Sequence, residues 1–358
     1  MPERAEASTD RAGRRSAAAR AALCASLGLL LATLPVAPAR AGSPDAAPYG
    51  EPGTRCEITD PRLPELSGLV SAGDTMLATN DGGDRAEVYV LDGSCAVADV
   101  RTGDVDPYDP EDLSLAADGT VWLADTGDNN RVRENVALIG LRPDGTSTLT
   151  RLTYPDGAHD VEAMLLAPDG TPYLVTKEVL GASAVYRPDV ALTDGDTVPM
   201  TKVLDLGFIL TGTPGGPVGR AGQLLVTGGA VSPDGQRIAL RTYTDAYVWP
   251  LSGSDVVGAL GSSPVRVALP DSRQGEAITF AANSRDLLVS GEGLPVAVTL
   301  VPASGTLEPA ASTAAAGTAG AVEGLAHHVS PLTAGLVAAL IATALVWIAG
   351  RLRRRHQG

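Results

Sequence analysis

Cysteine, histidine and aromatic residues are scarce in this sequence of 358 residues, and their scarcity excludes several kinds of chemistry. There are three cysteines, four histidines and an aromatic content of 4%. His159 is the only histidine between residues 42 and 302. The sequence contains neither a Gly-x-Ser-x-Gly elbow nor a His-Glu-x-x-His motif. We therefore expect neither a serine triad nor a zinc hydrolase.

Long uncharged stretches are also few, and they lie near the two ends. Residues 21–34 follow five arginines and precede an Ala-x-Ala site ending at Ala41, a pattern typical of a cleaved signal peptide at 1–41. Residues 331–350 are uncharged and would span roughly 30 Å as a helix, enough to cross a bilayer. Four arginines follow in the tail 351–358, so the positive-inside rule predicts a single-pass cell-membrane protein with a cytoplasmic C-terminus and an extracytoplasmic domain.

The middle of the chain is strongly acidic. Residues 42–330 contain 17 Lys and Arg against 39 Asp and Glu, a net charge of −22. This charge excludes nucleic acid as the main partner, and it suits either a cationic ligand or a surface that only keeps the domain soluble. We divide the segment into an ectodomain at 42–302 and a flexible stalk rich in Ala, Gly and Thr at 303–330. The even pair Cys56 and Cys95 predicts one disulfide bond outside the cytoplasm.

Tight turns recur along the ectodomain and divide it into similar units. Asp-Gly between two apolar stretches is a strong hairpin signal, because the turn needs positive φ. Five turns of this kind or its relatives fall near residues 74, 118, 169, 234 and 283. Intervals of this length with several strands each predict an all-β fold, a β-propeller. We expect five blades, with six as the alternative, and a loop insertion at 207–219.

The last of these units lacks a fourth strand before the stalk begins. The unused segment at 54–58 is the natural candidate, and it would close the ring by completing the last blade from the start of the chain. Cys56 would then lie one blade away from Cys95, a separation that a disulfide allows.

One position of the repeat holds glutamate in three of the five units. Seven residues before the turns lie Glu111, Glu162 and Glu276, whereas the other two units have Ser67 and Thr227 there. Equivalent positions of a propeller are related by its pseudo-rotation axis. We therefore expect the three glutamates to face one another at the mouth of a central channel.

Carboxylates that face one another at short range need a cation or a raised pKa. Oxygen ligands in this number suit Ca²⁺ or Mg²⁺, and we expect Ca²⁺. The predicted metal ligands are Glu111, Glu162, Glu276, Asp112 and Asp160. Charged side chains in propeller channels also serve only to close the ring, and this alternative stays open.

The second strand of each unit is expected to end at the same mouth. A mixed set of basic and acidic residues at these ends would suit a ligand beside the cation. The predicted ligand-binding residues are Lys177, Arg241, Asp125, Asp128 and Asp81.

Six segments carry a resemblance to known proteins: 110–116, 123–131, 160–166, 174–177, 232–243 and 274–278. Taken in this order, they resemble a family of bacterial secreted β-propellers. The family is similar in style to phytase-like and esterase-like propellers, in which Glu-Gly or Glu-Ala begins the inner strand. The resemblance implies calcium and phosphoester chemistry at Glu111, Glu162, Glu276, Lys177 and Arg241.

Two functions follow from these features. The first is a ligand-binding or scaffold module on the cell surface, anchored to the membrane by the C-terminal helix and taking a small molecule or a protein that the sequence does not identify. The second is a calcium-dependent phosphoester hydrolase. Propellers host both kinds of function, so the fold alone does not decide between them.

Overall fold

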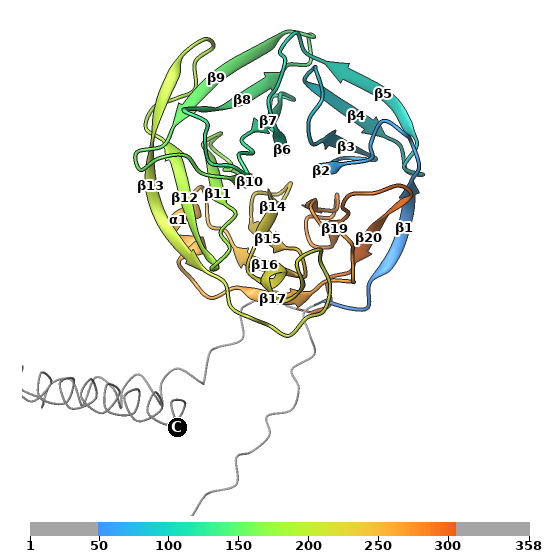
Figure 1. Cartoon of the computed structure of the whole chain (residues 1–358). Helices are drawn as coiled ribbons and strands as arrows, with labels where there is room; N and C mark the ends of the chain where they lie inside the picture. Colours follow the sequence, from blue (N-terminus) through green and yellow to red (C-terminus); the bar gives the residue numbers. More distant parts are fainter. Residues whose placement is uncertain (1–48, 306–358) are drawn as a thin grey trace, which may run out of the picture. The chain divides into compact units, whose positions relative to one another are not determined.

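The structure of the protein is a computed structural model that describes residues 49–305, and strands make up most of this part (Figure 1). The predicted signal peptide, most of the stalk, the membrane helix and the basic tail lie outside the described residues. Within 49–305, no helix is long and apolar enough to cross a membrane.

Most strands follow one another in antiparallel units of four. The first unit comprises β2 (Leu66–Ala72), β3 (Thr75–Asn80), β4 (Glu87–Leu91) and β5 (Val97–Thr102). The second comprises β6 (Pro110–Leu115), β7 (Val121–Asp125), β8 (Val136–Leu141) and β9 (Ser147–Thr153). The third comprises β10 (Val161–Leu166), β11 (Pro172–Thr176), β12 (Ala182–Pro188) and β13 (Thr197–Gly207). The fourth comprises β14 (Val226–Val231), β15 (Arg237–Thr242), β16 (Asp245–Pro250) and β17 (Val265–Ala268).

The fifth unit joins the two ends of the domain. It comprises β18 (Ile278–Phe280), β19 (Leu287–Val289), β20 (Val296–Val301) and, as its outer strand, β1 (Gly53–Ile58). β1 pairs antiparallel with β20, so the strand expected at 54–58 closes the last unit from the chain start. The predicted disulfide between Cys56 and Cys95 is confirmed, and it ties this closing strand to the turn between β4 and β5.

The units stand around a common centre like the blades of a propeller, which confirms the all-β expectation (Figure 1). The second and third units merge into one sheet of eight strands, because the start of the long strand β13 pairs in parallel with β9. No feature of the sequence predicted this parallel pairing.

The hairpin turns form where the sequence predicts them. Gly119, Gly170 and Gly235 follow the turn aspartates and have φ of +86°, +85° and +67°, values that an L-residue rarely adopts. Ser284 takes the equivalent conformation in the last unit, with φ of +59°. Each turn joins the two innermost strands of a unit, so the repeat seen in the sequence is a repeat of this inner hairpin.

The hydrophobic core lies between neighbouring units. Each cluster of buried apolar side chains within the described residues combines strands of two adjacent units, such as Val175 on β11 with Leu240 on β15. Burial of such side chains is the main force that holds the ring together.

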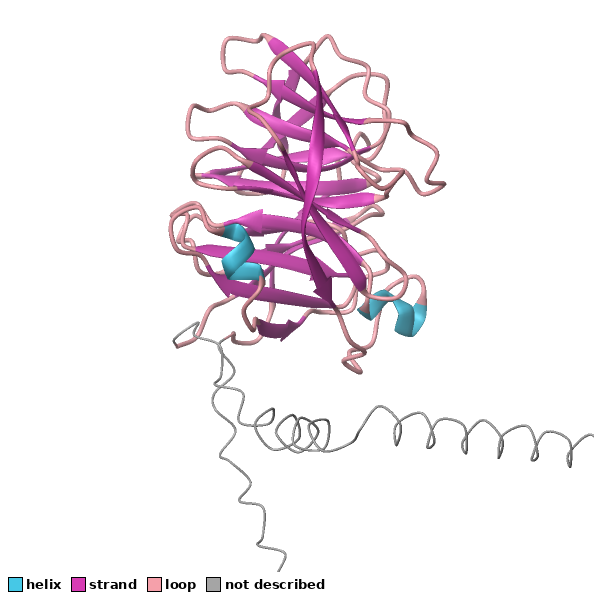
Figure 2. Cartoon of the chain, turned by 90° about the vertical axis from the view of Figure 1, so that its left-hand side faces the viewer, coloured by secondary structure: helices cyan, strands magenta, loops and turns pink. Residues whose placement is uncertain are grey.

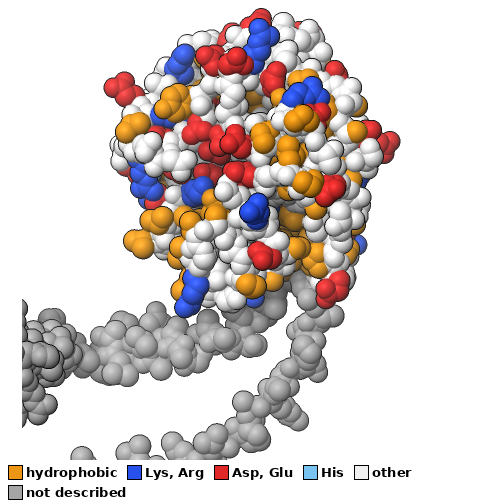
Figure 3. Space-filling view, turned by 45° about the vertical axis from the view of Figure 1, so that its right-hand side comes forward, with side chains coloured by type: hydrophobic (Ala, Val, Ile, Leu, Met, Phe, Trp, Pro, Cys, Tyr) orange, Lys and Arg blue, Asp and Glu red, His pale blue; other side chains and the backbone are white. Residues whose placement is uncertain are grey.

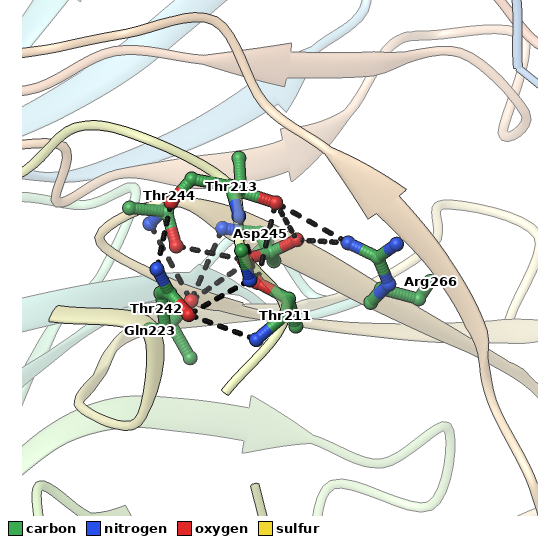
Figure 4. A network of polar contacts seen from close by, with 8 residues as sticks. Thr211, Thr213, Gln223, Thr242, Thr244, Asp245 and Arg266 are labelled. Atoms are coloured by element: carbon green, nitrogen blue, oxygen red, sulfur yellow. Dashed lines mark hydrogen bonds and ion pairs between the residues drawn. The ribbon is translucent and has the colours of Figure 1, made fainter. Parts of the chain in front are cut away.

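The loop inserted between β13 and β14 is fixed by a buried aspartate (Figure 4). The Asp245 carboxylate is fully buried and accepts hydrogen bonds from the Thr211 and Thr213 hydroxyls at 2.8 and 2.7 Å. Arg266 donates to it at 2.6 Å. This loop contains the short helix η1 (Gly219–Gln223), whereas α1 (Val256–Leu260) lies at the other end of the strands (Figure 2).

Candidate functional site

The repeat position that holds glutamate is a β-bulge in the structure. The pairing of β6 with β7 skips Glu111, and the pairing of β10 with β11 skips Glu162. Ser67 on β2 and Thr227 on β14 are skipped in the same way. A bulge turns the extra side chain away from the regular pleat, and bulges are frequent beside active sites. In these four units the repeat position therefore marks the residue at which the inner strand bulges, whereas Glu276 of the fifth unit precedes β18 and lies outside the strand.

These bulges lie at one end of the ring, which we call the mouth face. It is the end at which β2, β6, β10 and β14 begin and β3, β7, β11 and β15 end. The bulges of the first two units touch, since the Ser67 hydroxyl lies 3.2 Å from Oε2 of Glu111, and the Thr227 hydroxyl of the fourth unit donates to the Gly275 carbonyl of the fifth at 2.8 Å. Glu111, Glu162 and Glu276 are 3–5% exposed.

Five carboxylates gather here into what we call the mouth cluster. Its inner group consists of Glu111, Asp160 and Glu162, all buried, with oxygens within 4.8 Å of one another. Its outer group consists of Asp81, Asp109 and Glu111, again within 4.8 Å, and Asp81 and Asp109 are partly exposed. Glu111 belongs to both groups. Acidic side chains can be seen gathered on one face of the domain, with basic and hydrophobic side chains around them (Figure 3).

The mouth cluster binds protons more tightly than isolated carboxylates do. Burial raises the pKa of Glu111 well above its usual range, and the charge of Glu162 raises it further. Burial and a hydrogen bond with Asp81 raise the pKa of Asp109 to about 7. Burial likewise raises the pKa of Asp160 and of Glu162. Such groups become fully ionised near neutral pH only when positive charge is supplied.

Lys177 supplies one such charge. Its Nζ lies 2.7 Å from Oε1 of Glu162 and 5.3 Å from the centre of the Tyr243 ring. Burial lowers the pKa of Lys177, but the charges of Glu162 and Glu276 outweigh burial and raise it overall. The single positive charge of Lys177 does not neutralise the five carboxylates of the mouth cluster and the carboxylate of Glu276.

Glu276 provides independent support for a cation-binding site. Burial raises its pKa to about 7. Its Oε2 atom is buried and has no hydrogen-bond partner among the described residues. Buried polar atoms are almost always paired, so a carboxylate oxygen without a hydrogen-bond partner beside other carboxylates fits a cation-binding site. The donor set is all oxygen, which suits Ca²⁺ or Mg²⁺ better than a transition metal.

Arg241 lies beside the site, but its donors are occupied by the backbone. Its guanidinium is fully buried and donates to the carbonyls of Ala277 and Ser290, both at 2.9 Å. Burial lowers its pKa to about 10. The structure therefore shows Arg241 joining the fourth unit to the fifth.

Asp125 and Asp128 hold the loops around the mouth face. Asp125 accepts from the backbone amides of Tyr108 and Asp109 at 3.1 and 2.8 Å, and its Oδ1 lies 3.1 Å from Arg133. Asp128 accepts from the amides of Val132 and Arg133, while its own amide donates to Asp160 at 2.9 Å. These two residues position the cluster and lie outside both of its groups.

Asp112 also lies outside both groups, although it follows Glu111 directly. Its carboxylate accepts from the amides of Leu113 and Met164, both at 2.8 Å, and of Gly229 at 3.2 Å. Because these amides belong to three different inner strands, Asp112 links β6, β10 and β14 at the centre of the ring.

Asp109 is the site residue that sequence analysis missed, although a signal for it was present. Asp109 precedes Glu111 by two residues, just as Asp160 precedes Glu162. This Asp-x-Glu spacing places both members of each pair at the start of an inner strand. The backbone of Gly127 packs against the same carboxylates, since an added Cβ at this glycine would collide with Asp109 and Glu111.

Comparisons with known proteins assign no family. No family model matches the sequence, and no curated protein matches it. Among solved structures, a gluconolactonase from Xanthomonas campestris is 15% identical, with 72% of this chain and 99% of that chain covered and a TM-score of 0.41. An aldose sugar dehydrogenase from Streptomyces coelicolor, bound to PQQ, is 12% identical, with 70% and 98% covered and a TM-score of 0.36. Similarities of this size identify neither a family nor a substrate.

Proposed function

We propose that the domain is a five-bladed propeller that acts as a divalent-cation-dependent hydrolase at its mouth face. The proposal rests on the inner and outer groups of the mouth cluster, which share Glu111. The inner group is buried and suited to hold a cation firmly, whereas the outer group reaches the surface, where a substrate can approach. The orphaned Oε2 of Glu276 supports a cation rather than a self-sufficient ion-pair network.

A cation held by Glu111, Asp160 and Glu162 would polarise an ester carbonyl and lower the pKa of a bound water. The chain's own residues then have three tasks. Lys177, fixed by Glu162, places positive charge beside the oxygen on which negative charge develops. Asp109, partly exposed, is placed to take a proton from water. In the overall reaction water bonds to the acyl carbon, the bond to the leaving oxygen breaks, and that oxygen takes a proton.

A small cavity beside the outer group supports access from solvent. Its volume is about 250 Å³, and its lining includes Asn80 and Pro110, the chain neighbours of Asp81 and of Asp109 and Glu111. Arg62, Arg85 and Tyr89 also line it. A ligand in this cavity would lie next to the most exposed carboxylates of the mouth cluster.

We propose further that the domain faces the outside of the cell and is tethered to the membrane by residues 331–350. The disulfide between Cys56 and Cys95 supports an oxidising compartment, because such bonds are rare in reducing cytosol. The signal peptide, the stalk and the basic tail inferred from the sequence belong to the same proposal.

A binding module without turnover is the second candidate. The acidic excess at the mouth face favours it, because a cationic ligand would balance the charge without any chemistry. Phosphoester hydrolysis, which the resemblance implies, remains a variant of the first candidate and is included in the test.

The experiment measures hydrolysis by the full-length protein of a panel of carboxylic esters, lactones and phosphate monoesters, with Ca²⁺, with Mg²⁺ and with a chelator. We expect turnover that requires a cation and falls at least about 100-fold in Glu162→Gln. Glu57→Gln, at an exposed position of β1, is the matched control and should keep full activity. Cation binding without turnover of any substrate would replace the hydrolase with the binding module.

A further inference from the structure

Large hydrophobic side chains exposed on the domain gather at the mouth face. They lie in the loops before β6 and after β7, β11 and β13, all of which are at this end of the strands. Leu180 is 86% exposed and Ile209 is 73% exposed. Val190, 62% exposed, is the exception, since it lies in the loop between β12 and β13 at the opposite end. The exposed set at the mouth face comprises Tyr108, Val132, Val179, Leu180, Ile209, Leu210 and Val218.

Four of these exposed side chains stand on two adjacent loops, and we call them the apolar rim: Val179, Leu180, Ile209 and Leu210. Their two loops are joined directly, because the Phe208 amide donates to the Gly181 carbonyl at 2.7 Å. The second loop is also anchored from behind, since the Thr211 amide donates to Gln223 at 2.8 Å and the Thr211 hydroxyl to Asp245 at 2.8 Å (Figure 4). Hydrogen bonds therefore hold in place the two loops that carry the rim, while the side chains of the rim remain exposed to solvent.

The apolar rim begins next to the mouth cluster. Lys177, whose ammonium contacts Glu162, lies two residues before Val179 in the same loop. Tyr243, whose ring lies 5.3 Å from that ammonium, packs against Gly216 and Gly222 of the second loop. A ligand whose polar group reaches the carboxylates can thus lay an apolar part on the rim.

The charge of the site restricts which charge the polar group of such a ligand can carry. The six carboxylates of the mouth cluster and Glu276 exceed the three positive charges that Lys177 and one bound divalent cation would supply, and the donors of Arg241 are occupied by carbonyls. An anionic group would meet excess negative charge, whereas an uncharged ester would not.

We propose that the substrate is an uncharged ester or lactone with an apolar chain, its ester group at the mouth cluster and its chain on the apolar rim. This inference rests on the proposed function and deepens it. Phosphate monoesters, which are anionic, should therefore be the poorest substrates among the compounds tested.

The experiment compares long-chain and short-chain members of two series on the full-length protein. The p-nitrophenyl esters octanoate and acetate report on kcat/KM, and uncleavable methyl ketones of matching chain length report on binding by titration calorimetry. We expect the long chain to gain about 10-fold in both measurements, a fraction of what full burial of its methylenes would give. Leu180→Ser with Ile209→Ser should abolish the gain, and Val190→Ser, the matched control at the opposite face, should keep it.

Each outcome decides a separate claim. Chain-dependent ketone binding without hydrolysis of any ester overturns the proposed function and leaves the substrate-binding surface standing. Equal binding of long and short ketones, or no binding of either, overturns the present inference even if esters are hydrolysed. If the double variant changes only self-association or attachment to phosphatidylcholine vesicles, the rim serves a second copy or a lipid surface, and the inference is likewise wrong.

Discussion

Raising the pH in the absence of divalent cations should destabilise the protein, and Glu276 should account for a large part of the loss. Burial raises the pKa of Glu276 from its usual 4.5 to about 7. Between these two values the folded protein holds a proton that the unfolded chain has released. Stability is therefore highest below about pH 4.5 for this group and is lost as the pH rises through about 7. The linkage relation gives roughly 3 kcal/mol over this interval.

The assay is urea unfolding in the presence of a chelator across this pH interval. Wild-type protein should lose stability as the pH rises. Glu276→Gln should reduce the slope of the unfolding free energy against pH by the amount that about one bound proton contributes. Glu57→Gln serves as the control for the same chemical change at an exposed position and should leave the slope as it is. An identical slope in wild type and Glu276→Gln, or stability that rises toward neutral pH in both, would refute the assignment of a buried proton to this carboxyl.

Three further changes test other parts of the structure. Asp112→Ala leaves three backbone amides of different inner strands without an acceptor, so we expect a loss of roughly 3 kcal/mol in the free energy of unfolding, measured by calorimetry. Gly127→Ala should weaken cation affinity about 10-fold by pushing apart the carboxylates it touches, whereas Gly93→Ala, with open space around its added Cβ, should not. Replacing both Cys56 and Cys95 by serine opens a loop of 39 residues and should cost about 4 kcal/mol, without abolishing cation binding.

The inner hairpins were predictable because their turns have strict backbone requirements. Asp-Gly sequences indicate turns with positive φ, and the regular recurrence of these turns indicates a ring of similar sheets. Glu111, Glu162 and Glu276 could be selected together for the same reason, since a fixed distance from each turn places them at the same point of the repeat. The closing strand at 53–58 followed from the missing outer strand of the fifth unit.

The roles of individual polar residues were less predictable, because they depend on which way a side chain points. Asp112 and Glu111 are adjacent in sequence, but the bulge at Glu111 sends their carboxylates to different partners. Arg241 stands at the predicted strand end, but its guanidinium donates to carbonyls of the next unit, which the sequence does not indicate. The parallel pairing of β13 with β9 has no local sequence signal, because it joins two sheets that each look complete on their own.

Titration calorimetry of Ca²⁺ into the full-length protein tests the central claim most directly. The account predicts heat of binding in wild type and in Glu57→Gln, and its loss in Glu111→Gln, which removes the carboxylate shared by both groups of the mouth cluster. Unchanged Ca²⁺ binding in Glu111→Gln, or no binding of Ca²⁺ or Mg²⁺ to wild type, would contradict the account.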